Sequence, residues 1–123
     1  MNPSSGLKHI PWKDVEREPL NDKINRQMLC GDKLMLAKVF MKKGAHVPKH
    51  QHHNEQVTYI LEGALKFSVD GTEIVVHAGE VLCIPSNMPH EAWALEDTVD
   101  LDVFTPPRED WLNKTDNYLR HGR

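Results

Sequence analysis

Two histidines and a glutamine stand at a spacing that could hold a divalent ion. His50 and His52 are two residues apart in the run H-Q-H-H-N-E-Q, and Gln56 follows four residues later. Side chains two apart share one face of an extended strand, so the spacing predicts that these three groups point the same way. His90, in the later run I-P-S-N-M-P-H, offers a further imidazole. The sequence therefore predicts a metal site formed by His50, His52, Gln56 and His90.

The identity of the fourth ligand has an alternative, because Glu55 precedes Gln56 directly. Strand alternation favours Gln56, since Glu55 falls on the face opposite to His52 unless a bulge intervenes. Three neutral imidazoles and a neutral amide leave the charge of a divalent ion uncompensated. Such a site should attract an anionic substrate and polarise it as a Lewis acid. Imidazole ligands do not select one metal, so the ion could be Ni, Zn, Fe, Mn or Co.

The last apolar strand carries a second set of reactive side chains. In the run V-D-L-D-V-F-T-P-P-R, alternation places Asp100, Asp102 and Phe104 on one face. Two carboxylates on a strand usually face solvent, but beside a cation they would gain a reason to point inward. Asp102 could then transfer a proton at a bound substrate. Arg108, just past the two prolines, could grip a substrate carboxylate with its bidentate fork.

These side chains have to be positioned by strands. From Lys23 onward, short apolar segments alternate with turn signals, and no long helical period separates them, which predicts an all-β sandwich or barrel. The pair Asp70-Gly71 is a strong hairpin signal, and Arg108 to Asn113 predicts one or two helical turns. The expected strands are 24–30, 34–41, 56–61, 65–69, 72–77, 81–84, 90–95 and 98–105.

Length and composition bound the remaining possibilities. The chain has 123 residues, enough for one domain with a single core. We expect an arm over residues 1–22, anchored by Ile10, Trp12 and Val15, a barrel over residues 23–113 and a partly ordered tail over residues 114–123. No apolar run is long enough to cross a bilayer or to serve as a secretion signal, so a cytoplasmic protein without a membrane partner is expected. The net charge of −3 gives no reason to expect a nucleic-acid partner.

Two motifs in order resemble those of the cupins. The first cupin motif is Gly, five residues, His-x-His, three or four residues, Glu, six residues, Gly; the second is Gly, five residues, Pro-x-Gly, two residues, His, three residues, Asn. The chain departs from them by Gln56 in place of Glu, Asn87 in place of the second Gly and Ala94 in place of the final Asn. The matching positions are Gly44, His50, His52 and Gly63, followed by Gly79, Pro85 and His90. The resemblance implies a single-domain jelly-roll β-barrel.

The run L-D-x-F-x-P-P-R-E-D-W-L looks like that of the pectin-degradation cupins of the KdgF type. Those proteins convert 4,5-unsaturated uronates, the products of polyuronate lyases, into linear keto sugars. The resemblance covers about residues 32–112. It implies that His50, His52, Gln56 and His90 bind one divalent transition-metal ion. It further implies Asp102 as general acid and base, Phe104 as a wall that packs against substrate, and Arg108 as the carboxylate clamp.

Two other functions fit the same residues. Three-histidine cupins commonly serve as metal-dependent oxygenases or isomerases acting on small enolic substrates, and a barrel with a metal could also bind a ligand without turning it over. An inward Asp102 speaks against simple anion capture, because a second negative charge would repel the ligand. All three functions share a small anionic molecule as partner. A homodimer is also expected, because the N-terminal arm could cover an open strand edge.

Overall fold

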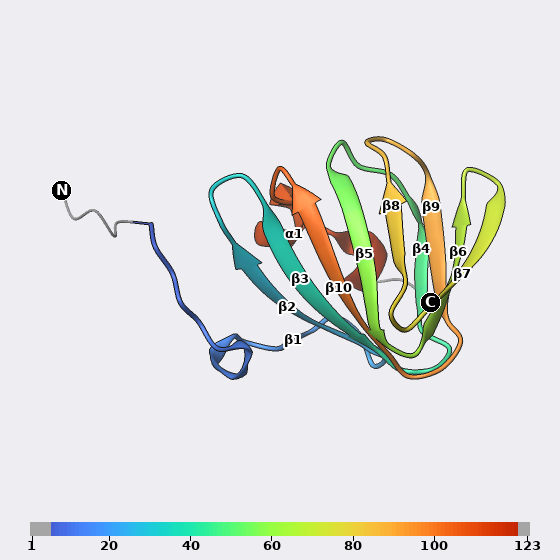
Figure 1. The fold of residues 1–123 in the computed structure, drawn as a ribbon, viewed down its shortest axis with the longest axis horizontal. Coiled ribbons are helices and arrows are strands. Elements are labelled where there is room, and N and C mark those ends of the chain that lie inside the picture. The colour runs from blue at the N-terminus through green and yellow to red at the C-terminus, as the bar shows by residue number, and fades with distance from the viewer. Residues whose placement is uncertain (1–5, 121–123) are drawn as a thin grey trace.

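Two antiparallel sheets face each other in the computed structural model, which describes residues 6–120 (Figure 1). The first sheet has the order β1-β2-β3-β10-β5-β8 and the second β4-β9-β6-β7. This confirms the predicted all-β, jelly-roll class. The strands of the first sheet are β1 (Glu18–Pro19), β2 (Ile24–Cys30), β3 (Met35–Met41), β10 (Thr98–Thr105), β5 (Glu55–Glu62) and β8 (Val81–Ile84); those of the second are β4 (His46–His50), β9 (His90–Ala94), β6 (Ala64–Val69) and β7 (Thr72–His77).

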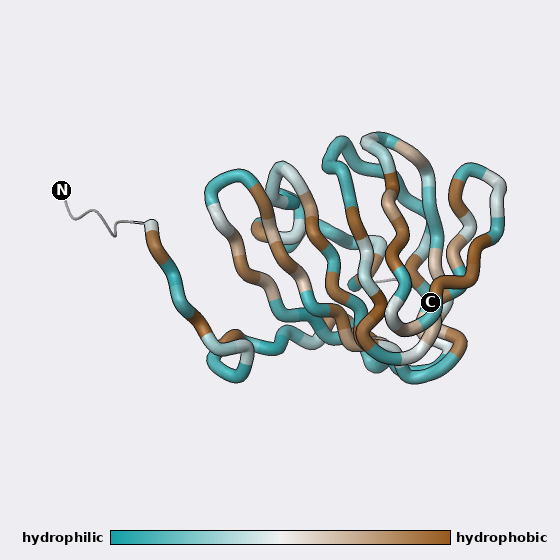
Figure 2. Tube along the Cα trace, viewed as in Figure 1, coloured by the Kyte–Doolittle hydropathy of each residue, from teal (hydrophilic) through white to brown (hydrophobic). Residues whose placement is uncertain are grey.

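The core lies between the two sheets and follows from strand alternation. Along β3, Met35, Ala37, Val39 and Met41 are buried while the residues between them are half-exposed. Hydrophobic and hydrophilic positions alternate in the same way along the central strands (Figure 2). Because side chains two apart share a face, one face of β3 and β10 enters the core and the other does not.

Tight turns fix the register of the strands. Asp70 and Gly71 both have positive φ, 48° and 86°, and join β6 to β7 as the expected two-residue hairpin. Gly63 ends β5 with φ of 88°, and a Cβ there would lie 2.4 Å from the carbonyl oxygen of Asp97. Asn87 has φ of 64°. Asparagine is among the few residues that tolerate this conformation, which explains how it replaces the second glycine of the cupin motif.

One local prediction is wrong. His50 through Gln56 do not form a single strand, because β4 ends at His50 and β5 begins at Glu55 in the opposite sheet. The connecting residues 51–54 carry His52 outside any strand. The buried Asn54 does not face the imidazoles but donates from Nδ2 to the carbonyl oxygen of Pro106, 2.6 Å away. The passage of the chain from one sheet to the other through residues 51–54, rather than strand alternation, therefore determines where these side chains point.

The segments at the two ends of the chain differ in part from expectation. In the arm, a 3-10 turn, η1 (Trp12–Asp14), is held by Gln27, whose Nε2 donates to the carbonyl oxygens of Trp12 and Val15. Ile10 is exposed and does not anchor the arm as expected. The predicted helical turn is present as α1 (Glu109–Leu112), and a further short helix, α2 (Asn117–Arg120), follows in the tail.

Residues 1–5 and 121–123, which belong to the expected arm and tail, lie outside the described part of the chain. None of the helices in residues 6–120 has the length and apolar character needed to span a bilayer.

Candidate metal centre

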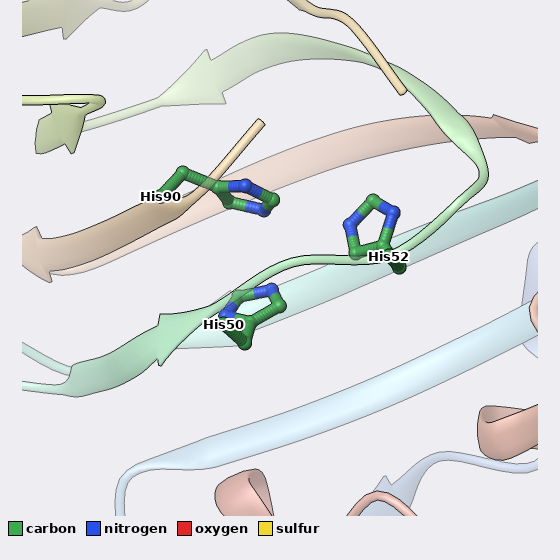
Figure 3. Close-up of side chains that lie close together, drawn as sticks. All are labelled: His50, His52 and His90. Atoms are coloured by element: carbon green, nitrogen blue, oxygen red, sulfur yellow. The ribbon is translucent and has the colours of Figure 1, made fainter. Parts of the chain in front are cut away.

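Three histidines meet at one end of the space between the sheets. His50 ends β4, His90 begins β9, and the two face each other in the register of these strands. His52 approaches from the connection to β5, and the three rings point toward one another (Figure 3). One ring nitrogen from each histidine lies within 4.8 Å of those of the other two. In a protein, such a cluster of imidazoles is a site for a transition-metal ion.

The loop that carries His52 is held by hydrogen bonds to one other loop. The backbone N–H of Asn87 donates to the carbonyl oxygen of His52 at 2.8 Å, and Ser86 Oγ donates to that of His53 at 2.6 Å. Both donors belong to the connection that leads into His90. The two halves of the site are therefore fixed to each other although they are far apart in sequence.

Each imidazole is oriented by the backbone near it. The Nδ1 atoms of His50, His52 and His90 lie 2.8, 3.0 and 2.8 Å from carbonyl oxygens two residues away. A carbonyl oxygen only accepts, so each Nδ1 carries the proton and each Nε2 keeps its lone pair. The Nε2 of His90 is buried and has no partner among the described residues. A backbone-held Nδ1–H with a free Nε2 is the arrangement of metal-ligating histidines.

The three imidazoles are neutral at physiological pH. Burial is the largest cause and lowers the pKa of His50 to about 3 and that of His52 to about 4. Burial also lowers the pKa of His90. The positive charge of Arg108 contributes to all three reductions. Neutral rings present lone pairs, so protons do not compete for the site near neutral pH.

Gln56 faces this cluster, whereas Glu55 is exposed. The Gln56 amide is oriented by Nε2, which donates to Thr58 Oγ1 at 2.8 Å, so its Oε1 lies 3.2 Å from His52 Nε2. A neutral His52 has one N–H and cannot donate to Gln56 and to its backbone carbonyl at once. Two lone pairs therefore face each other, which is unfavourable unless a cation lies between them. The donors present thus fit a metal ion held by three Nε2 atoms and one amide oxygen.

Asp102 is buried beside Gln56, and it shares its face of β10 with Asp100 and Phe104 as strand alternation predicted. Thr58 Oγ1 donates to Asp102 Oδ1 at 2.6 Å, and Gln56 Nε2 lies 3.5 Å from the same oxygen. Burial raises the pKa of Asp102 to about 6, although these hydrogen bonds oppose the increase. The buried Asp100 hydrogen-bonds to Asp102, and burial raises its pKa well above the usual range. A carboxyl group with a pKa near neutrality can both accept and return a proton.

Phe104 and Arg108 complete the set of expected residues. Phe104 is buried and packs edge-on against the His52 ring, with centroids 5.7 Å apart. Arg108 is also buried, but its guanidinium group already makes a bidentate interaction with a carboxylate of the same chain. Its Nε and Nη2 donate to Asp110 at 2.9 and 2.8 Å. Its Nη1 is buried and has no partner among the described residues. In this structure Arg108 therefore offers the cavity one free donor instead of a bidentate pair.

The tail contributes residues that the sequence did not indicate. Tyr118 stacks on His50, with ring centroids 4.3 Å apart and planes inclined by 23°. Together with Leu119 it lines the cavity that also borders Asp102 and Arg108. Trp111 lies beneath, edge-on to Phe104 at 5.0 Å. The apolar pair Y-L after two polar residues was the available signal, but a cavity wall supplied by a tail has no characteristic spacing.

The histidine pKa values predict how the metal-free protein responds to acid. His50 and His52 bind protons near pH 6.5 when unfolded but only near pH 3 and 4 when folded. The unfolded state therefore binds more protons between pH 6.5 and 4, and these histidines lower the free energy of unfolding as pH falls through this window.

We expect the wild type to lose more stability from pH 7 to pH 5 than His50→Leu does, as measured by urea denaturation of chelator-treated protein. His77→Leu, at an exposed position, is the matched control and should follow the wild type. Asp102 acts in the opposite sense because its pKa is raised, but it is common to all three proteins and cancels in the comparison. Equal pH dependence in wild type and His50→Leu would contradict the expected neutral, buried imidazole.

Comparisons with known proteins agree with this geometry. The profile of the cupin domain matches residues 37–105. The pectin degradation protein KdgF of Dickeya dadantii (strain 3937) is 30% identical over 105 residues, which are 83% of this chain and 91% of that protein. An RmlC-like cupin from Shewanella frigidimarina has a TM-score of 0.79 and 33% identity, covering 85% of this chain and 96% of its own. KdgF from Halomonas sp. has a TM-score of 0.76 and 27% identity, with coverage of 80% and 93%. The chain belongs to the cupin family, and pectin-degradation proteins of the KdgF type are among its relatives.

Proposed function

We propose that this cupin is a metal-dependent enzyme that converts 4,5-unsaturated uronates into linear keto sugars. The observation that carries the proposal is the meeting of three kinds of group at one cavity. These are the free Nε2 atoms of the histidines, the buried carboxyl group of Asp102 and the unpartnered Nη1 of Arg108. A uronate offers a carboxylate and ring oxygens that match these groups. The similarity to KdgF supports this substrate class.

His50, His52, His90 and Gln56 are the proposed ligands of one divalent transition-metal ion. The bound ion would supply Lewis acidity toward the oxygen atoms of the substrate. Because all four donors are neutral, the site keeps a net positive charge that favours an anionic sugar. Glu55 is not a ligand in this proposal because its side chain is exposed on the other side of β5.

The proposed reaction is an isomerisation that needs no oxidant and consumes no water. In the cyclic substrate, the C1 hydroxyl loses its proton, the bond from C1 to the ring oxygen breaks, and the ring oxygen gains a proton, so that an aldehyde and an enol result. The enol then becomes a ketone when C4 gains a proton and the enol hydroxyl loses one. Asp102 is proposed to accept and return these protons, because its pKa of about 6 makes either direction accessible near neutral pH.

The neighbouring residues position the substrate and the acid. Thr58 donates to one oxygen of Asp102 and so helps to fix the orientation of the carboxyl group. Phe104 closes one side of the cavity and packs against the sugar ring in this proposal. Arg108 Nη1 donates to the uronate carboxylate, and a buried guanidinium makes a stronger hydrogen bond than an exposed one.

The proposed function is tested by adding metal-loaded protein to an unsaturated monouronate. We expect the absorbance of the conjugated double bond to disappear in proportion to enzyme, because C4=C5 is consumed when the ketone forms. Chelator-treated protein is the control and should be inactive until the metal is restored.

Parallel measurement with an oxygen electrode separates the alternatives. The isomerisation uses no oxygen, whereas an oxygenase acting on an enolic substrate would consume it. Tight uronate binding without loss of absorbance would contradict the proposed catalysis and favour a ligand-binding protein. Oxygen uptake in step with substrate loss would replace isomerisation by oxygenation.

A further inference from the structure

The cavity beside the histidines is too small for a sugar. Its volume is about 50 Å³, whereas pockets that bind small organic ligands usually have about 300–1,000 Å³. Strands supply most of its walls, and each of these strands is hydrogen-bonded to a neighbour in its sheet. Arg108 and Trp111, at and within α1, and Tyr118 and Leu119, from α2, supply the remaining wall, and neither helix belongs to a sheet. Some part of the wall must move for a substrate to enter. The parts without strand pairing are α1 with Arg108 and α2, and α2 is the one whose Tyr118 covers the His50 ring.

The contacts of Tyr118 connect this wall to the reactive groups. Its ring stacks on His50, and its hydroxyl accepts hydrogen bonds from Arg108 Nη2 at 2.8 Å and Trp111 Nε1 at 3.0 Å. While Tyr118 is in place, Nη2 of Arg108 is shared between Asp110 and the phenol. Withdrawal of Tyr118 would release one of these two bonds and widen the cavity at the same time.

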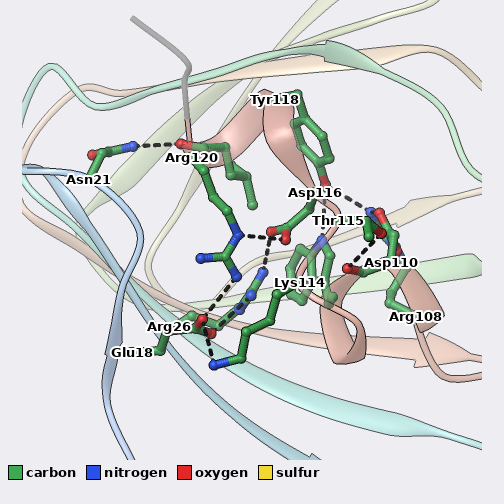
Figure 4. Close-up of polar contacts among 12 residues, drawn as sticks. Glu18, Asn21, Arg26, Arg108, Asp110, Lys114, Thr115, Asp116, Tyr118 and Arg120 are labelled. Carbon is green, nitrogen blue, oxygen red and sulfur yellow. Dashed lines mark hydrogen bonds and ion pairs between the residues drawn. The ribbon is translucent and has the colours of Figure 1, made fainter.

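A cluster of ionic contacts holds α2 in this position (Figure 4). Glu18, on the N-terminal arm, accepts from Arg26 at 3.0 Å and from Arg120 at 2.9 Å, and pairs with Lys114 at 3.3 Å. Asp116 is buried and accepts from Arg26 at 2.7 Å and Arg120 at 3.1 Å. The carboxylate of Glu18 thus fastens the tail to the arm across the barrel edge. The Arg26–Asp116 pair is buried, whereas the contacts of Glu18 with Arg120 and Lys114 reach the surface through partly exposed cationic side chains, so the Glu18 contacts are the ones that open more readily.

We propose that residues 116–120 form a lid over the metal centre, with Tyr118 as the gating residue and Glu18 as its latch. The closed lid admits only small molecules, and the open lid exposes the histidines and Arg108 to an anionic sugar. The lid therefore determines the size of substrate that reaches the site. This inference rests on the proposed metal site but not on the proposed uronate chemistry.

The test measures how fast a metal ion leaves the site. The protein is loaded with Co²⁺, and the uncharged chelator 1,10-phenanthroline is added while its cobalt complex is followed by absorbance. We expect Tyr118→Ala to raise the stripping rate about tenfold, because one hydrogen bond to a charged group and one ring contact are lost. Asn117→Ala, an exposed change on the same helix, is the matched control and should strip at the wild-type rate.

Two further measurements separate gating from a direct effect on the ion. A lid controls access, so Co²⁺ uptake should accelerate together with stripping while the equilibrium affinity stays within about twofold. Glu18→Gln, which leaves the cavity wall unchanged, should also accelerate stripping, because it weakens all three contacts of the latch. A wild-type stripping rate in both Tyr118→Ala and Glu18→Gln would overturn the lid. A stripping rate that rises only in proportion to a loss of equilibrium affinity for Co²⁺ would also overturn the lid.

Hydrogen exchange keeps the lid testable if the protein takes up no cobalt, a result that would refute the metal centre of the proposed function. In metal-free protein, amides of residues 116–120 should exchange faster in Glu18→Gln than in wild type, while the β6–β7 hairpin stays unchanged. Equal exchange of residues 116–120 in the two proteins would overturn the lid. Failure to convert a uronate, in contrast, would leave both the stripping and the exchange results as they are.

Discussion

Replacing His90 with alanine should lower the affinity for a divalent transition-metal ion by at least about 100-fold, since even the loss of an outer hydrogen-bond partner of a metal ligand costs about 10–100-fold. His90 Nε2 is buried and unpartnered among the described residues, and its Nδ1 is held by the carbonyl oxygen of Met88. The ring is therefore aimed at the centre before any ion arrives. Metal content after dialysis, measured by elemental analysis, and titration with Co²⁺ or Ni²⁺ would check this result.

The controls for this prediction come from the same stretch of sequence. His53→Ala removes an exposed imidazole next to His52 and should leave the metal content unchanged. Gln56→Ala should weaken binding less than His90→Ala does, because an amide oxygen is the weakest of the four proposed donors. Full metal content in His90→Ala would mean that the cluster of three imidazoles is not the binding site, and the proposed chemistry would then lack its centre.

The parts of this fold that were predictable depend on local rules. The bounds of β2, β7, β8 and β10 coincide with the predicted ranges 24–30, 72–77, 81–84 and 98–105. Each of these strands is bordered by a turn signal in the sequence, and turn geometry is set by a few adjacent residues. The shared face of Asp100, Asp102 and Phe104 followed from alternation along β10, and the structure places this face inward. Local periodicity therefore suffices wherever the chain stays within one sheet.

The geometry that could not be predicted depends on contacts between distant segments. The histidine motif crosses from one sheet to the other between His50 and Glu55, so alternation does not apply there. The ligand positions are set instead by loop hydrogen bonds, such as that from the backbone of Asn87 to His52. The tail likewise acquires its place through Glu18, which is 102 residues away from Arg120. Spacing and family resemblance indicated which histidines come together, but not the backbone path that brings them together.

The buried pair of carboxyl groups on β10 has a cost that points to function. Asp100 and Asp102 are both buried, and neither has an ion pair with a cation among the described residues. Burying a carboxyl group without a cation disfavours its charged form. A folded-state pKa of about 6 for Asp102, above its ordinary value, means that this residue lowers the free energy of unfolding as pH rises from about 4 to 6. A protein under selection for stability alone has no use for such a residue.

Asp102→Asn should accordingly separate activity from stability. The amide keeps the shape and can still accept the hydrogen bond from Thr58, but it cannot take up a proton. We expect turnover of an unsaturated uronate to fall by about 10²–10⁴-fold, the usual contribution of a general acid or base. Metal content should be retained, and the free energy of unfolding at pH 8 should rise because the buried charge is removed. Glu73→Gln, the same chemical change on an exposed strand position, should leave turnover, metal content and the free energy of unfolding unchanged.

An Asp102→Asn enzyme as active as the wild type would remove this residue from the reaction. A loss of both turnover and stability would instead assign Asp102 to the structure of the site, so the combination of an inactive and more stable variant is the result that identifies it as the proton-transferring group.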